Sequence, residues 1–132
     1  MGHVFVEVKL TNPLTQDIIT VPEAVVDTGA TFTTIPQILG EKLRLKPFTK
    51  RKVRTSGEEE LAESILLIRI QEEETVNPVL ISPRIDRVLV GVLTLEALGL
   101  KVEPKTGKLE KTELLLLLLL AENMPFNPLK QH

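Results

Sequence analysis

The sequence contains no cysteine, no tryptophan and no tyrosine, and it has only two histidines among 132 residues. Without cysteine, the chain cannot form disulfides, hold a metal through thiolates or use a thiol nucleophile. His3 and His132 stand near opposite ends of the sequence, so no histidine-rich metal site is expected. A basic surplus is also missing. The formal net charge of −2 gives no electrostatic footprint for nucleic acid, so nucleic-acid binding is not expected.

No basic segment followed by an apolar core begins the chain, so we expect no signal peptide and a cytoplasmic location. The longest apolar run is the seven leucines Leu114–Leu120. A membrane-spanning helix needs about 20 apolar residues, so no membrane span is predicted. The run fits a helix, which Thr112 could cap, and it also fits a strand buried on both faces. Because exposed leucines promote aggregation, we expect it in the core or in a dimer interface.

Aspartate is rare as well: the chain has three, Asp17, Asp27 and Asp86, against fifteen glutamates. Asp27 follows the apolar run Ala24–Val26 and opens an Asp-Thr-Gly turn. Valine favours a strand, and Gly29 permits a tight turn in which the backbone comes close to a ligand. A carboxylate on a short side chain at the end of a buried strand is held in a fixed position, as acid–base chemistry requires.

Alternation of apolar residues and the positions of glycine and proline predict mostly strands. The expected strands are Val4–Leu10, Asp17–Val26, Thr31–Ile35, Lys50–Ser56, Leu61–Ile70, Val76–Ile81 and Val88–Val90, followed by a hairpin over residues 101–110. Pro22 implies an edge position or a local break. Pro36 opens a short helix that ends near Leu43. The glutamate-rich segments Gly57–Glu60 and Glu72–Glu74 are predicted to be polar turns.

The segment Val26–Ala30 resembles the active-site loop of retropepsin-like aspartic peptidases. A second segment, Val88–Leu93, is similar to the apolar-apolar-glycine segment that this family carries late in the domain, and Thr94–Gly99 looks like the helix that follows it. Arg54–Glu59 stands where the family places its flap hairpin. The resemblance covers roughly Val4 to Leu109, and the order of three elements is more specific than Asp-Thr-Gly alone.

The resemblance implies a mainly β fold: a small closed β-barrel of the retropepsin (acid protease) type, with one or two short helices, that forms a homodimer. Residues 1–110 would make the peptidase domain. Residues 111–123 would be a leucine-rich segment in the core or the dimer interface, and residues 124–132 a flexible tail.

The same resemblance implies an aspartic endopeptidase that hydrolyses a polypeptide substrate with an activated water and needs no metal or organic cofactor. The chemistry uses two carboxyl groups, and the chain has one Asp-Thr-Gly and no internal duplication, so two copies must pair across a two-fold axis. Two Asp27 side chains held close together would share one proton. Matched to the motif, the catalytic residues are Asp27, Thr28 and Gly29. The predicted substrate-binding residues are Ala30, Thr31, Ser56, Gly57, Glu58, Val90 and Gly91.

Two positions depart from the retroviral pattern, in which an acidic residue follows the active-site loop and an arginine follows the late glycine. Thr31 and Val92 stand there instead, which implies a different dimer interface. We expect cleavage at bonds flanked by apolar residues, with an acidic optimum. The acidic tip Gly57–Glu60 would disfavour acidic substrates. The alternative is a catalytically silent, dimeric peptide-binding or interaction module, but such a module has no need of a carboxylate pair that repels itself.

Overall fold

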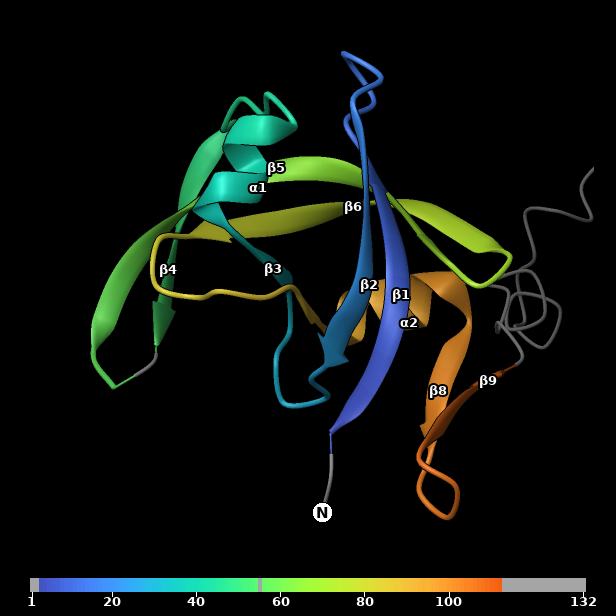
Figure 1. Cartoon of the computed structure of the whole chain (residues 1–132). Helices are drawn as coiled ribbons and strands as arrows, with labels where there is room; N and C mark the ends of the chain where they lie inside the picture. Colours follow the sequence, from blue (N-terminus) through green and yellow to red (C-terminus); the bar gives the residue numbers. More distant parts are fainter. Residues whose placement is uncertain (1–2, 55, 113–132) are drawn as a thin grey trace, which may run out of the picture.

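A computed structural model describes residues 3–54 and 56–112 of the chain. In this part the fold is mainly β, with two short helices. The elements, in chain order, are β1 (Val4–Thr11), β2 (Ile18–Val26), β3 (Thr33–Pro36), α1 (Gln37–Lys42), β4 (Thr49–Arg54), β5 (Glu58–Ile70), β6 (Glu73–Ser82), β7 (Leu89–Val90), α2 (Val92–Leu98), β8 (Leu100–Glu103) and β9 (Lys108–Lys111). Figure 1 shows β1 beside β2, the long strands β5 and β6 crossing behind them, and the β8–β9 hairpin projecting at one end.

Strands β1 and β2 form an antiparallel pair, and apolar side chains alternate along β1. Val8 and Leu10 point into the core with no exposed surface. The pairing register shifts between Val6 and Val8, opposite the Pro22-Glu23 segment. Since Pro22 has no N–H to donate to the ladder, a local irregularity of this kind is expected there. The sequence predicted an edge position or a local break at Pro22; β2 runs through it as one strand, with this irregularity in its pairing to β1.

Seven strands form one sheet in the order β1-β2-β7-β3-β6-β5-β4, and β1 additionally pairs with β5. The short strand β7 lies parallel to β2 and antiparallel to β3. Strand β3 in turn lies parallel to β6. This insertion of β7 places the end of β2, which leads into Asp27, directly beside the end of β7, which leads into Gly91.

The core lies inside this curved sheet and beneath α2. Its fully buried members include Leu66, Ile68 and Ile70 on alternate positions of β5. Burying one such side chain stabilises the fold by about 1.5–3 kcal/mol relative to leaving it in water. At the end of α2, Gly99 adopts a left-handed conformation with φ of 69°, which a glycine does without strain.

Both glutamate-rich turns are shorter than expected. Strand β5 already begins at Glu58, so Glu58–Glu60 pair with β4 instead of forming the turn. Their partners Arg54, Val53 and Lys52 belong to a basic strand, and opposite charges across an antiparallel pair are favourable. In the same way, Glu74 lies opposite Arg69 within the β5–β6 pair. Strand pairing therefore overrides the weak strand propensity of glutamate at these positions.

The predicted leucine-rich segment and tail lie outside the described residues, apart from Lys111 and Thr112. Within residues 3–54 and 56–112, neither helix is long and apolar enough to cross a bilayer.

Candidate active site

Asp27 lies at the end of β2, and its backbone is fixed by the neighbouring segment. The Val25 N–H donates to the Val88 carbonyl, and the Asp27 N–H donates to the Val90 carbonyl, both at 2.9 Å. Val25 and Val26 are buried, so the strand that carries the aspartate is anchored in the core. The position of the Asp27 Cα therefore depends on β7 as much as on β2.

The turn after Asp27 orients its carboxylate. The Gly29 N–H donates to Asp27 Oδ1 at 3.0 Å, and the Ala30 N–H donates to the Asp27 carbonyl at 3.1 Å. A Cβ added at Gly29 would lie 3.3 Å from Asp27 Oδ1, so a side chain at this position would crowd the carboxylate. Asp27 is half-buried, whereas Thr28 and Gly29 are exposed. The carboxyl group is thus held in place and remains reachable from outside.

A second segment crosses this loop and locks it. The Val92 N–H donates to the Ala30 carbonyl at 2.8 Å, and the Leu93 N–H donates to the Thr31 carbonyl at 3.0 Å. The contact is so close that a Cβ at Gly91 would lie 2.5 Å from the carbonyl carbon of Phe32. Only a residue without a side chain fits there.

Three polar side chains connect the two segments, and two of them, Thr33 and Thr94, are buried. The Gly91 N–H donates to Thr33 Oγ1 at 3.0 Å, and the Thr33 and Thr94 hydroxyls are 2.6 Å apart. Thr94 Oγ1 donates to Asn77 Oδ1 at 3.2 Å. The sequence alone did not reveal this chain of hydrogen bonds. Thr33 and Thr94 are separated by 61 residues, so no local pattern could reveal that they meet.

Replacing Thr33 by valine should therefore destabilise the protein by about 1–3 kcal/mol, because the buried Gly91 N–H loses its acceptor. Denaturant unfolding would measure the loss. The matched control is Thr34→Val, since the Thr34 hydroxyl makes only a 3.4 Å contact to the Phe32 carbonyl and is partly exposed. Equal stability of the two variants would show that the hydroxyl chain contributes nothing.

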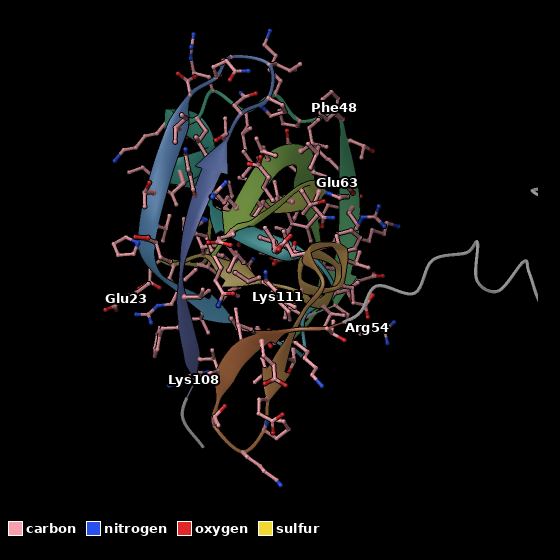
Figure 2. The ribbon with its side chains drawn as sticks, turned by 90° about the vertical axis from the view of Figure 1, so that its right-hand side faces the viewer. Glu23, Phe48, Arg54, Glu63, Lys108 and Lys111 are labelled. Atoms are coloured by element: carbon pink, nitrogen blue, oxygen red, sulfur yellow. The ribbon has the colours of Figure 1, made fainter. Side chains whose placement is uncertain are left out.

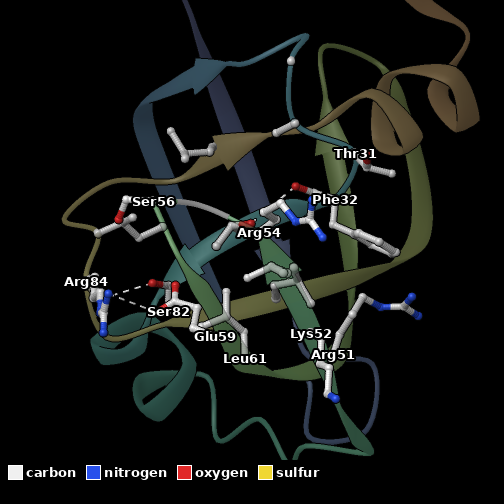
Figure 3. Close-up of a pocket in the computed structure, with 17 residues that line it drawn as sticks. Thr31, Phe32, Arg51, Lys52, Arg54, Ser56, Glu59, Leu61, Ser82 and Arg84 are labelled. Atoms are coloured by element: carbon white, nitrogen blue, oxygen red, sulfur yellow. Dashed lines mark hydrogen bonds and ion pairs between the residues drawn. The ribbon is translucent and has the colours of Figure 1, made fainter.

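A cleft of about 680 Å³ opens beside the Asp27 turn. It is lined by Gly29, Ala30, Thr31, Phe32, Thr34, Arg51, Lys52, Val53, Arg54, Ser56, Glu59, Leu61, Leu80, Ser82, Arg84, Ile85 and Leu89. Figure 3 shows Thr31 and Phe32 on one side of it and Arg84, joined to Glu59, on the other. The β4–β5 hairpin and the loop before β7 thus face the residues that follow the Asp27 turn.

The structure brings four of the predicted site residues into this lining: Gly29, Ala30, Thr31 and Ser56. Asp27 and Thr28, which directly precede Gly29 in the chain, are not among the lining residues. Gly57 and Glu58 continue the hairpin after Ser56 without lining the cleft, and both are exposed. Val90 and Gly91 are buried behind the Asp27 turn.

The basic side chains of the cleft were not predicted as site residues. Arg51 Nε contacts Glu63 Oε1 at 2.6 Å, and its guanidinium carbon lies 4.4 Å from the centroid of the Phe32 ring. The hydrogen bond to Glu63 raises the pKa of Arg51 above its ordinary value, so Arg51 remains charged. Arg84 contacts Glu59 at 3.2 Å. The signal in the sequence is the basic stretch Lys50–Arg54, which gives no indication of which face of β4 meets the cleft.

Within the part of the chain that the structure describes, no three carboxylate or imidazole side chains gather closely enough to hold a metal ion.

Comparison with known proteins agrees with this arrangement. Residues 16–92 match the family described as "Aspartyl protease", which is more than half of the chain. The chain therefore belongs to the aspartyl protease family. No curated protein matches it.

Solved structures of retropepsin-like proteases share the fold. The simian foamy virus protease is 23% identical, with a TM-score of 0.51 over 69% of this chain and 90% of that one. A retropepsin-like aspartic protease from Rickettsia conorii is 21% identical, with a TM-score of 0.57 over 78% of this chain and 76% of the other. The EIAV protease, solved with the inhibitor HBY-793, is 16% identical, with a TM-score of 0.56 over 77% of this chain and 93% of that one. At these identities the likeness establishes the retropepsin-like fold alone.

Proposed function

We propose that the protein is an aspartic endopeptidase whose active site forms between two copies of the chain, each supplying one Asp27-Thr28-Gly29 turn. The observation that carries this proposal is the position of Asp27. Its carboxylate is held by the Gly29 N–H at 3.0 Å, and Gly29 lines a cleft of about 680 Å³ large enough for part of a peptide.

Pairing of two chains follows from the chemistry. One carboxyl group must take a proton while the other donates one, and the chain has a single Asp-Thr-Gly. A two-fold axis near the exposed Asp27 turn would bring the two side chains together. Two carboxylates at hydrogen-bonding distance cannot both ionise cheaply, so the pair would hold one proton over a wide pH range. The return of the strand order from β5 to β1 supports a closed barrel in each subunit.

In the proposed reaction the ionised Asp27 takes a proton from a water, and the resulting hydroxide oxygen bonds to the carbonyl carbon of the peptide. The protonated Asp27 of the pair hydrogen-bonds the carbonyl oxygen as negative charge develops on it. The C–N bond then breaks, and the leaving nitrogen receives a proton from the pair. At the end a new carboxyl and a new amino group have formed, and one water has been consumed.

The surrounding residues have supporting roles in the proposal. Thr28 would bridge the two Asp27 turns across the axis, and the Gly29 N–H fixes the carboxylate. Ala30 and Thr31 would contact the peptide from one side of the cleft. Ser56, Gly57 and Glu58, in the β4–β5 hairpin, would close over it from the other side. Val90 and Gly91 would act from behind, by holding the Asp27 turn.

A dimeric site predicts that specific activity depends on protein concentration. Cleavage of an unstructured polypeptide, divided by the amount of protein, should rise with concentration and level off where sedimentation shows a dimer. Dilution into an inert carrier protein controls for surface loss. Specific activity that stays constant while sedimentation shows only monomers would contradict the composite site. A folded dimer that cleaves nothing would favour the silent interaction module.

A further inference from the structure

The charged residues that line the cleft next to Asp27 are mostly cationic. Four of the residues that line it are cationic: Arg51, Lys52 and Arg54 from β4, and Arg84 from the loop before β7. The only carboxylate among the lining residues of the described chain is Glu59. Such a surface attracts anionic groups and disfavours cationic ones.

Two of these cations already have partners. Arg51 contacts Glu63 and the ring of Phe32, and Arg84 contacts Glu59. A bound carboxylate would have to compete with these contacts. Glu59 is also the one residue of the glutamate-rich Glu58–Glu60 segment that lines the cleft, and Arg84 balances its charge.

Lys52 and Arg54 differ from them, because neither makes an ion pair with any residue in the ranges 3–54 and 56–112. Both are exposed, although Glu60 and Glu58 lie opposite them in the β4–β5 register. Arg54 is the last residue of β4, where the hairpin begins. Figure 2 shows it at the other end of β4 from Phe48, and Figure 3 shows it between Arg84 and Phe32 in that view.

We propose that the cleft selects polypeptides with a glutamate or aspartate side chain close to the scissile bond, and that Arg54 is the residue that recognises this carboxylate. The inference rests on the proposed peptidase function and names the substrate class of that site. A guanidinium offers two parallel N–H donors, which match the two oxygens of a carboxylate. The half-buried Phe32 ring adds an apolar wall for the methylene groups of the substrate side chain.

This inference reverses the expectation from the sequence that an acidic hairpin tip would disfavour acidic substrates. Glu58 and Glu60 do not line the cleft, whereas Glu59, which lies between them on β5, does. The basic strand β4 determines the charge of the lining instead.

The test uses pairs of peptides that are identical except at one position, which holds glutamate in one peptide and glutamine in the other. In successive pairs, this position is placed at each residue on either side of a cleaved bond. At pH about 6, where a glutamate is ionised, we expect kcat/KM to favour glutamate by about five- to tenfold at its best position. The preference should fall towards one in about 1 M salt, and also below pH about 3.5, where the substrate carboxyl takes up a proton.

Arg54→Gln should bring the ratio of the two kcat/KM values close to one, and Arg54→Lys should restore part of it. The matched control is Arg69→Gln, which removes an exposed arginine outside the cleft and should leave the ratio unchanged. The salt and pH dependence of the unmodified protein provide a test that needs no variant to fold.

The outcomes separate the two proposals. Cleavage of both peptides at equal rates at every position, or a preference that Arg54→Gln leaves intact, would overturn the inference and leave the peptidase function standing. Cleavage of neither peptide would count against the peptidase function. In that case we would measure binding of the same two peptides, labelled with a fluorophore. Tighter binding of the glutamate peptide that is lost in Arg54→Gln would support the inference. Equal binding of the two peptides, or no binding of either, would overturn it.

Discussion

Asp27→Asn is expected to reduce kcat/KM for peptide hydrolysis by about 10³-fold or more while the protein stays folded. An asparagine in this position cannot take a proton from water, and two of them cannot share one. The fold should survive because the Asn side-chain oxygen can still accept the hydrogen bond that Gly29 N–H now donates to Asp27 Oδ1. The side chain is only half-buried, so the loss of charge requires no repacking.

The measurement is the initial rate of polypeptide cleavage, with circular dichroism and sedimentation to show an unchanged fold and assembly. Asp86→Asn is the matched control. It removes a carboxylate of the same type whose side chain is 93% exposed. The Asp86 carboxylate makes one long ion pair, with 3.6 Å between its Oδ1 and Arg87 Nε. If Asp27→Asn cleaved as fast as the control variant, Asp27 would not be the catalyst.

Mixing the subunits sharpens this experiment. An excess of Asp27→Asn added to the parent protein should lower the rate, because mixed dimers contain one aspartate and one asparagine. Asp86→Asn added in the same amount should not lower it. A rate that stays proportional to the parent protein alone, under conditions where subunits exchange, would show that one chain is sufficient.

The second large effect is expected for Gly91→Ala, which should destabilise the fold by about 3 kcal/mol or more and abolish cleavage. The added Cβ would lie 2.5 Å and 2.6 Å from the Phe32 carbonyl carbon and oxygen, and 2.8 Å from the Thr31 oxygen. All three are backbone atoms, so no side chain can rotate away. The two segments would have to separate, which breaks the hydrogen bonds from Val92 and Leu93 to the Asp27 loop.

Denaturant unfolding measures this effect, and Gly57→Ala is the control. A Cβ at Gly57 would meet no atom within 4 Å, so the stability of that variant should remain within about 0.5 kcal/mol of the parent. A Gly91→Ala protein as stable as Gly57→Ala would mean that the two loops do not cross as closely as described.

Strand pairing and backbone hydrogen bonds between distant segments account for the differences between the expected and observed elements. The alternation that predicts β1 is local, and β1 is found where expected. Glu58–Glu60 read as a turn because glutamate is a poor strand former, yet they pair with the basic strand β4. The predicted strand at Thr31 begins at Thr33, because the carbonyls of Ala30 and Thr31 accept hydrogen bonds from Val92 and Leu93.

Residues close together in the chain are enough to predict the mainly β class, the Asp-Thr-Gly turn after a buried strand, and the late glycine segment. What supports and surrounds the turn follows only from the folded arrangement: the contact of Thr33 with Thr94, the close crossing at Gly91, and the cationic residues that line the cleft. Those contacts join residues that are far apart in the sequence, such as Gly91 and Thr33, which are separated by 58 positions. Their partners are set by sheet register and strand order, which local sequence patterns do not specify.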